Sequence, residues 1–300
     1  MTKHFQHKIE YIFLKLLIFI LNHLPLKIAL RFGDVIGILA FSVLRIRRRV
    51  TLTNLRNSFG GEYTDKQYRK IGLRSYINFA RSMIEYGMFP RLVEKDLSLK
   101  IKIVGQHSYR EYLNKGAGVV LVSGHFGSWE LMGAYLAQIG WPIDFLVGIQ
   151  HNPLINNLMN KHRGIFGVGL IEVGLTARGV ITALRKGRAI AMLSDQDAGA
   201  DGVIVDFLGR AASTPKGPAA FALKTDCPIF VISFVRNELD KHTLFIEGPI
   251  IMKKTGDREE DIKRLTQAYT DIIEKYVRLH PDHWFWAHRR WKTTYPEIYH

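Results

Sequence analysis

The sequence predicts an α/β fold with a mostly parallel central sheet flanked by helices, preceded by an apolar helical segment at the N-terminus. From Gly105 onward, short apolar runs alternate with helical segments, a pattern typical of parallel strands covered on both faces. The 300 residues are 47% apolar, which is enough for the core of one large domain. Residues 9–24 are more apolar than an ordinary surface helix needs to be.

The N-terminal run, residues 9–24, predicts a helix whose one polar stripe consists of Lys8, Lys15 and Asn22 at seven-residue intervals. A helix needs roughly 20 apolar residues to span a bilayer. Because this run is shorter and contains Lys15, it either lies in a membrane interface or spans the membrane obliquely. No small-residue cleavage site follows it, so we do not expect a signal peptide.

A second apolar segment, residues 35–44, is followed by Arg45 and by the arginines at 47–49. The net charge is +15, and residues 1–100 hold 18 Lys and Arg against 7 Asp and Glu. Apolar surface beside positive charge suits an anionic bilayer, where each basic residue contributes about 1 kcal/mol. The alternative is an ordinary helical layer on the core with solvated arginines. We predict a membrane-associating helical segment over residues 1–50 and an α/β domain over residues 51–300.

The elements of the α/β domain follow from apolar periodicity and from the glycines and prolines between the runs. The predicted strands are 119–122, 144–147, 170–173, 189–193, 203–207, 229–234 and 243–247. The predicted helices are 129–138, 154–166, 176–186, 216–224 and 258–279. Between them, residues 209–217 are predicted to form a loop that leads into a helix, with Thr214 as N-cap and Pro215 at the first helical position.

Composition and motifs exclude several kinds of site. Cys227 is the one cysteine, so no internal disulfide forms, and its apolar surroundings predict a small core residue. The histidines are scattered and no His-Glu-x-x-His occurs, so we expect no zinc site and no other bound metal or cofactor. No nucleic-acid-binding signature is present, so the basic surplus indicates a membrane surface or an acidic partner protein.

The strand at 119–122 runs into Gly124-His-Phe-Gly-Ser-Trp-Glu130, which carries the first candidate site. His125 can take a proton from a hydroxyl, and Glu130 in the first turn of the next helix can fix its tautomer and stabilise the imidazolium. The alternative is that His125 is a turn residue and Glu130 complements the helix dipole. The other pair with this spacing, His242 and Glu247, lies in a predicted strand, where an odd offset sends the side chains to opposite faces.

Ligands gather at the carboxyl ends of the strands in open sheets of this kind. Asp195 and Asp197 follow the strand 189–193, where they either orient a substrate in the cavity of His125 or close the turn. An Asp-x-Asp can also hold a divalent metal on a sugar nucleotide, as in many glycosyltransferases. Arg163 either grips a substrate phosphate with its planar fork or simply complements a helix C-terminus. The Trp-rich segment 284–291 fits a bilayer boundary or a plug over the core.

These motifs together resemble the bacterial lipid A biosynthesis acyltransferases, a lauroyl- and myristoyltransferase group within the lysophospholipid acyltransferase superfamily. The resemblance spans nearly the whole chain and depends on the joint order of several motifs more than on any one of them. They are Gly124-His-Phe-Gly-Ser-Trp-Glu130, Asp195-Gln-Asp-Ala-Gly, Gly202-Val-Ile-Val-Asp-Phe-Leu-Gly209, Ala212-Ser-Thr-Pro-Lys-Gly217 and Trp284-Phe-Trp-Ala-His-Arg-Arg-Trp291. The superfamily usually has His-x4-Asp, and here the acid is Glu130.

The resemblance implies an O-acyltransferase in which His125 is the general base and Glu130 orients it. Backbone donors around residues 126–128 are then expected to stabilise the oxyanion. Arg163, Asp195 and Asp197 are expected to hold acceptor or donor, with Arg289 or Arg290 near an acidic headgroup. The implied donor is an acyl-acyl carrier protein or acyl-coenzyme A, and the implied acceptor is a lipid A precursor or a related anionic glycolipid. The implied location is the cytoplasmic face of the bacterial inner membrane.

Two other functions stay open at this stage. One is a metal-dependent glycosyltransferase that uses Asp195 and Asp197, and the other is a non-catalytic membrane-binding protein in which His125 is incidental. The acyl chain length, the choice of carrier and the identity of the acceptor do not follow from the sequence, because they depend on the tertiary shape of a pocket.

Overall fold

The computed structural model describes residues 3–172 and 177–299. Within these residues the main sheet has seven strands in the order β1-β9-β8-β2-β5-β3-β4, and β8 with β9 is the one antiparallel pair in it. Two further strands, β6 and β7, form a separate antiparallel hairpin. The strands are β1 Ile101–Val104, β2 Val119–Ser123, β3 Ile143–Val147, β4 Gly169–Glu172, β5 Ala189–Leu193, β6 Val203–Phe207, β7 Arg210–Thr214, β8 Ile229–Glu238 and β9 Lys241–Ile250.

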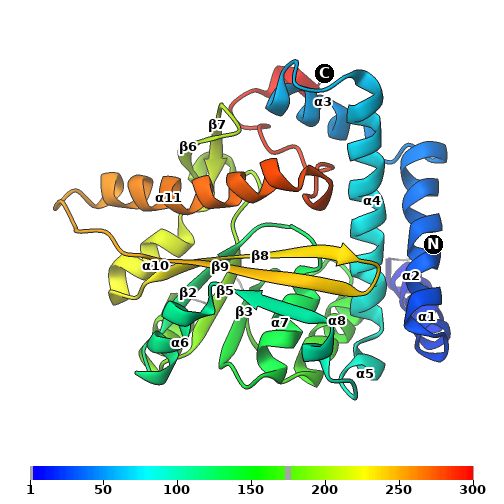
Figure 1. Cartoon of the computed structure of the whole chain (residues 1–300), viewed down its shortest axis with the longest axis horizontal. Helices are drawn as coiled ribbons and strands as arrows, with labels where there is room; N and C mark the ends of the chain where they lie inside the picture. The colour runs from blue at the N-terminus through cyan, green and yellow to red at the C-terminus, as the bar shows by residue number, and fades with distance from the viewer. Residues whose placement is uncertain (1–2, 173–176, 300) are drawn as a thin grey trace.

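Helices cover both faces of this sheet (Figure 1). They are α1 Lys3–His23, α2 Leu26–Ile38, α3 Arg48–Phe59, α4 Asp65–Gly87, α5 Phe89–Leu92, α6 Gln106–Asn114, α7 Trp129–Gln138, α8 Pro153–Ile165, α9 Ala177–Arg185, α10 Gly217–Thr225 and α11 Arg258–Leu279. A π-helical turn at Leu39–Val43 continues α2, and short 3-10 turns lie at Leu97–Leu99, Gly199–Asp201, Pro281–His283 and Pro296–Tyr299.

The central strand β2 shows how the core is divided. All five of its residues are buried. Val120 and Val122 belong to one hydrophobic cluster, which includes residues of α9, α10 and α11, whereas Val119 and Leu121 belong to another, with residues of α6 and α7. Alternate side chains of a strand point to opposite faces, so β2 anchors both layers at once.

The predicted α/β class with a mostly parallel sheet and flanking helices is confirmed. The bounds predicted for β5, β6, α7 and α11 match the structure, and the other predicted elements differ by a few residues at their ends. The predicted ends at Val173 and Thr176 lie outside the described residues. The strand β1 was not predicted.

The loop prediction for residues 209–217 is wrong in its first half, because β7 occupies Arg210–Thr214 and α10 begins only at Gly217. Leu208 and Gly209 both have positive φ, +57° and +74°, and they form the two-residue turn between β6 and β7. Two such residues in succession give the type I′ turn that favours a tight hairpin. The N-cap of α10 is Lys216, so neither Thr214 nor Pro215 begins that helix.

The N-terminal helices α1 and α2 both contact α4, at the right-hand edge of the molecule (Figure 1). Over the part of the chain that the structure describes, no helix is both long enough and apolar enough to cross a membrane. The boundary predicted between residues 50 and 51 falls inside α3, Arg48–Phe59.

Candidate active site

The neighbouring parallel strands β2 and β5 end side by side, and each is followed by one member of a hydrogen-bonded pair. Their register sets Ser123 opposite Leu193, so His125 and Asp195 both stand two residues beyond the last strand pair. Nδ1 of His125 lies 2.8 Å from Oδ1 of Asp195, and the backbone N–H of His125 donates to Oδ2 at 2.6 Å. Because a carboxylate only accepts, Nδ1 carries the hydrogen and Nε2 presents its lone pair away from Asp195.

The turn that carries His125 needs glycine at two positions. Gly127 has a φ of +59°, and a Cβ there would lie 1.8 Å from the carbonyl oxygen of Phe234. A Cβ at Gly124 would lie 2.9 Å from Oδ2 of Asp195. Glycine therefore lets the turn approach both β8 and the carboxylate.

The C-terminal segment closes over this turn and supplies a hydrogen bond that the sequence did not predict. The indole N–H of Trp284 donates to Oδ2 of Asp195 at 2.7 Å. The backbone N–H of Phe285 donates to the carbonyl of His125 at 3.0 Å, and that of Gly127 donates to the carbonyl of His283 at 2.9 Å. The predicted Trp-rich segment is thus a buried plug over the core, because Trp284, Trp286 and Trp291 are at most 1% exposed.

Asp195 is 3% exposed, and its hydrogen bonds explain why a carboxylate is stable there. Burial by itself would raise the pKa of Asp195. The charge of His125 and the hydrogen bonds from His125 and Trp284 outweigh that effect, so the pKa of Asp195 is lowered from its ordinary value. The carboxylate is therefore ionised at neutral pH and can stabilise a protonated imidazole.

The sequence predicted that Glu130 orients His125, and the structure pairs Glu130 with Arg163 instead. Arg163 donates to the two carboxylate oxygens of Glu130 at 3.0 and 2.6 Å, and to Asn160 Oδ1 at 3.0 Å. Burial would lower the pKa of Arg163, but the hydrogen bonds and the charge of Glu130 raise it. Glu130 lies at the start of α7, where the guanidinium from α8 meets it, whereas the β2–β5 register brings Asp195 to the imidazole.

His125, Glu130 and Arg163 nevertheless line the same cavity, which has a volume of about 240 Å³. It is bounded by the ends of β2, β3 and β5 and by α7 and α8, and its wall includes Met159. The His125 side chain is 24% exposed. The amide Nε2 of Gln196 lies 3.4 Å from Nε2 of His125, so an N–H donor stands beside the ring nitrogen that is not bonded to Asp195.

Asp197, Arg289 and Arg290 lie apart from the hydrogen-bonded pair of His125 and Asp195. Asp197 accepts hydrogen bonds from the hydroxyl of Thr293 at 2.7 Å and from the N–H of Gly199 at 3.3 Å. Arg289 is exposed, with its guanidinium 5.7 Å from the ring centre of Tyr299, and it does not line the His125 cavity. No group of three His, Cys, Asp or Glu side chains suited to a metal ion occurs among residues 3–172 and 177–299.

Arg290, which was predicted together with Arg289 as a candidate neighbour of an acidic headgroup, is 1% exposed and donates to the carbonyl of Ser213 and the hydroxyl of Thr214. Burial lowers the pKa of its guanidinium to about 10. Two of the backbone donors predicted for the oxyanion among residues 126–128 already have acceptors. The N–H of Phe126 donates to Gly124 and that of Gly127 to His283, so neither points freely into the cavity.

The second His-x4-Glu pair behaves as its strand position predicts. His242 is 3% exposed and stacks on Phe234, with an interplanar angle of 6°. Glu247 accepts hydrogen bonds from Lys275 and Tyr276, both at 2.6 Å, on the side of α11. The two side chains therefore point apart.

Comparison with known proteins shows that most of the chain is similar to bacterial acyltransferases. A family model described as bacterial lipid A biosynthesis acyltransferase matches residues 1–293. The chain is 24% identical to the lipid A biosynthesis lauroyltransferase of Escherichia coli (strain K12), over 90% of this chain and 87% of that protein. It is 22% identical to the phosphatidylinositol mannoside acyltransferase of Mycolicibacterium smegmatis, over 72% and 71%. It is 28% identical to the lipid A biosynthesis acyltransferase of Haemophilus influenzae, over 71% and 67%.

Proposed function

This chain belongs to the bacterial lipid A biosynthesis acyltransferase family and is an acyltransferase, and from that premise we propose how its active site works. It transfers a fatty acyl chain from an acyl thioester to a hydroxyl of a lipid A precursor or related glycolipid. His125 is the general base, and Asp195 takes the orienting role that the sequence assigned to Glu130. The observation that carries this proposal is the hydrogen bond between Nδ1 of His125 and Asp195, at the mouth of a cavity.

The reaction proceeds by one addition and one elimination. Nε2 of His125 accepts the proton of the acceptor hydroxyl while the hydroxyl oxygen attacks the thioester carbonyl carbon. The imidazolium that forms is stabilised by the ionised Asp195. As the tetrahedral intermediate collapses, the carbon–sulfur bond breaks and the thiol leaves with the proton from Nε2. A base of this kind contributes roughly 10²- to 10⁴-fold to the rate.

Glu130 and Arg163 shape the floor of the same cavity in this proposal. The buried ion pair fixes α7 against α8, and both side chains remain within the cavity wall. Asp197 and Thr293 hold the C-terminal segment that carries Trp284, so Asp197 acts through that segment.

The donor in this proposal is an acyl-acyl carrier protein, with acyl-coenzyme A as the alternative carrier. The basic surplus of the first 100 residues suits an acidic carrier protein as well as an anionic lipid. The acceptor class follows from relatives that are named as acting in lipid A biosynthesis and on phosphatidylinositol mannoside.

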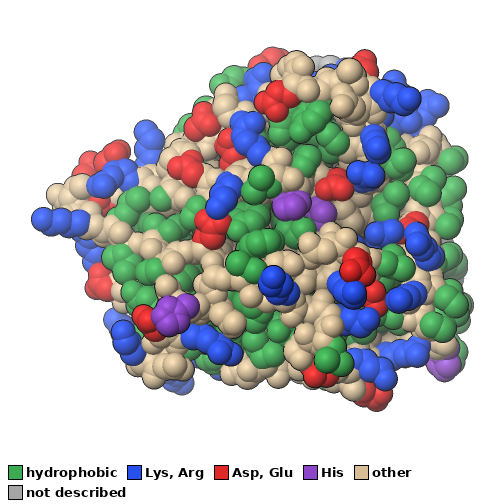
Figure 2. All heavy atoms as spheres, in the orientation of Figure 1, with side chains coloured by type: hydrophobic (Ala, Val, Ile, Leu, Met, Phe, Trp, Pro, Cys, Tyr) green, Lys and Arg blue, Asp and Glu red, His purple; other side chains and the backbone are tan. Residues whose placement is uncertain are grey.

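The enzyme is proposed to work at the cytoplasmic face of the bacterial inner membrane, held there by the outer surface of α1 and α2. Exposed apolar side chains recur along α1 at helical spacing, and α2 carries a second stripe. They are Phe5, Ile9, Ile12, Phe13, Leu16, Phe19 and Ile20 on α1, and Ile28, Phe32, Val35 and Ile36 on α2. Figure 2 shows hydrophobic side chains with Lys and Arg beside them at this edge. Apolar area and basic charge together form the two signals of an interfacial anchor.

The experiment that tests the function uses purified protein, an extract of bacterial lipids, and acyl-acyl carrier protein or acyl-coenzyme A as donor. Mass spectrometry should find a lipid that gains one acyl unit when wild-type protein is present. The His125→Ala protein, if it is folded, should produce no such gain. Circular dichroism and the thermal midpoint establish that the variant is folded. No mass gain with any donor, or an equal gain with the variant, contradicts the proposal.

A further inference from the structure

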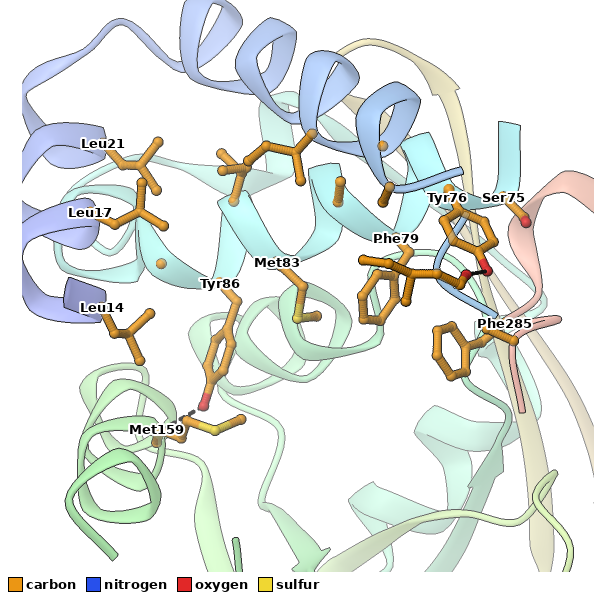
Figure 3. A pocket seen from close by; sticks show the side chains of 18 of the residues that line it. Leu14, Leu17, Leu21, Ser75, Tyr76, Phe79, Met83, Tyr86, Met159 and Phe285 are labelled. Atoms are coloured by element: carbon orange, nitrogen blue, oxygen red, sulfur yellow. Dashed lines mark hydrogen bonds between the residues drawn. The ribbon is translucent and has the colours of Figure 1, made fainter. Parts of the chain in front are cut away.

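A second, larger cavity lies between the N-terminal helices and α4, on the opposite side of Met159 from the His125 cavity. Its volume is about 490 Å³, and α1, α2, α4, α8 and the segment around Phe285 form its walls. Figure 3 shows Leu14, Leu17 and Leu21 of α1 facing it from one end, with Phe79 and Phe285 at the other.

The walls of this cavity are mostly apolar. Each polar side chain in the lining makes a hydrogen bond within the protein: Ser75 to Gly72, Tyr76 to Ile46, Tyr86 to Met159, His162 to Tyr86, Arg47 to Ala287 and Trp286 to Pro281. The remaining lining consists of aliphatic residues, phenylalanine, methionine and glycine. A preformed cavity with mostly apolar walls favours a hydrocarbon occupant.

The shape of the cavity fits a single chain. Its α4 wall runs from Ser75 to Gly87, which at 1.5 Å per residue is about 18 Å. An extended carbon chain advances about 1.3 Å per bond, given bonds of about 1.5 Å at tetrahedral angles, so the wall matches about 14 bonds, or about 15 carbons.

One end of the cavity stands next to the reacting atoms. The rings of Phe79 and Phe285 lie 4.8 Å apart, and the Phe285 ring lies 6.5 Å from that of His125. Trp129 lies 5.2 Å from His125 and 6.0 Å from Phe79, so three aromatic rings separate the cavity from the imidazole. A chain that passes these rings has its polar end beside His125.

Resting on the proposed function, we propose that this cavity binds one hydrocarbon chain of the membrane-resident acceptor lipid and presents its hydroxyl to His125. Its roof is formed by α1 and α2, whose outer faces are the apolar surface proposed to meet the bilayer. Ile36 both lines the cavity and is 36% exposed on that surface. A lipid chain can therefore leave the bilayer and enter without crossing water. In this proposal the acyl chain of the donor thioester binds in the smaller His125 cavity.

Cross-linking in His125→Ala protein tests this assignment without turnover. One probe is a phosphatidylglycerol with a diazirine at the end of one chain, in phosphatidylglycerol vesicles, and the other is an acyl-coenzyme A with the same group. The lipid probe should label the peptides that carry Leu17, Leu21 and Met83. The acyl-coenzyme A probe should label the peptides of Met132 and Phe145, which line the His125 cavity.

Gly87→Leu should reduce the labelling of Leu17 and Leu21 by at least about tenfold, because its side chain adds four carbons and the loss of even two buried methylenes is worth that much. A Cβ at Gly87 would meet Ile18 and Leu21 at 3.6 Å, an ordinary contact, so the new side chain fits by filling the cavity. Ala80→Leu, which alters the same wall, should act in the same direction. Gly179→Leu is the matched control, since its Cβ also meets one side chain at 3.6 Å but lies on α9, away from the cavity.

Two results overturn the proposal. In one, the acyl-coenzyme A probe labels Leu17, Leu21 and Met83 and displaces the lipid probe, which makes this the donor site. In the other, the lipid probe labels only outward residues such as Phe13, equally in wild-type and Gly87→Leu protein. Failure of the proposed function would appear separately, as absence of a His125-dependent mass gain in the lipid assay.

Discussion

Asp195 accepts two hydrogen bonds from His125, one from ring Nδ1 at 2.8 Å and one from the backbone N–H at 2.6 Å. A side chain held through both its ring and its own backbone has little freedom to rotate away. The carboxylate therefore fixes the position of the turn as well as the tautomer of the imidazole.

Replacing Asp195 by Asn should reduce kcat by roughly 10²- to 10⁴-fold, because an amide neither selects the productive tautomer nor stabilises the imidazolium. Single-turnover transfer from acyl-coenzyme A measures this loss, and Trp fluorescence with the thermal midpoint shows that the variant is folded. Asp197→Asn is the matched control. It should keep more of the activity, since Asp197 bonds to Thr293 and not to His125. Equal losses in the two variants would contradict the assignment.

The Glu130–Arg163 pair should contribute more to the stability of the fold than to the function of His125 as a base. Each side chain is nearly buried, at 6% and 11% exposure, so removing one leaves the other charge without its partner. Glu130→Gln or Arg163→Met should lower the free energy of unfolding by about 3–5 kcal/mol. Glu130→Met with Arg163→Met should recover much of that loss, which urea denaturation of the full cycle measures.

The pH profile of kcat separates the two roles of the carboxylates. A folded Glu130→Gln protein should keep the wild-type shape of that profile, because Glu130 makes no hydrogen bond to His125 in the described structure. If the pH profile of kcat for Glu130→Gln were altered in the same way as that of Asp195→Asn, Glu130 would be the residue that orients His125.

The sequence predicted the elements with strong local signals and failed where tertiary pairing decides. The bounds of α11 follow from Asp257, which accepts hydrogen bonds from the N–H groups of Glu259 and Glu260 as a capping residue should. The strand β7, Arg-Ala-Ala-Ser-Thr, has few residues typical of strands, and it exists because β6 pairs with it. The strand β1 is four residues long, with Lys102 in its middle, and among the strands that the structure describes it pairs with β9 alone.

The partner of His125 shows the same limit within the site. Local spacing favoured Glu130, which stands five residues away, over Asp195, which stands 70 residues away. The choice depends on β2 and β5 being neighbours in register, and no local pattern encodes strand order. Trp284 was noted for its ring, but its hydrogen bond to Asp195 depends on the C-terminal segment crossing the His125 turn.

Buried His242 should make the fold sensitive to mild acid. Burial lowers the pKa of His242 to about 3, and its ring nitrogens have no hydrogen-bond partner among the described residues. Glu85 favours protonation while Arg236 and His283 oppose it. In the unfolded chain the pKa is about 6.5, so below that pH the unfolded state binds a proton that the folded state does not. Stability is therefore lost as the pH falls from about 6.5 toward 3.

His242→Phe should remove this contribution, since a phenyl ring can keep the stacking on Phe234 and cannot titrate. Between pH 6.5 and pH 4 the wild-type protein should lose roughly 3 kcal/mol more unfolding free energy than the variant. Urea denaturation at several pH values measures the difference. Parallel losses in both proteins would show that His242 is not the group responsible.

Gln196 should contribute to the transition state through its side-chain N–H, which lies 3.4 Å from Nε2 of His125. In the described structure the N–H groups of Phe126 and Gly127 already have acceptors, whereas this side-chain N–H stands beside the imidazole. Gln196→Ala should lower kcat by about 10²- to 10³-fold with little change in KM for the donor. Gln196→Glu, which has a similar shape and no donor, should be at least as impaired. Activity in Gln196→Glu near the wild-type level would assign the oxyanion contact elsewhere.

The outer face of α1 should decide how tightly the protein binds vesicles. Ile12 and Phe13 are 63% and 75% exposed, so charged replacements there disturb little packing. Burying such side chains is worth about 1.5–3 kcal/mol each. Ile12→Glu with Phe13→Glu should therefore lower partition into phosphatidylglycerol vesicles by at least about tenfold.

Leu99→Glu provides the control for added charge, because Leu99 is 77% exposed and lies outside the N-terminal helices. Its partition should fall far less than that of the α1 variant, and the difference should persist at about 1 M salt, where screening removes most of the electrostatic part. Co-sedimentation with vesicles measures both. Equal effects of the Leu99 and α1 variants would mean that charge alone governs binding, and would leave the apolar face of α1 without the role proposed for it.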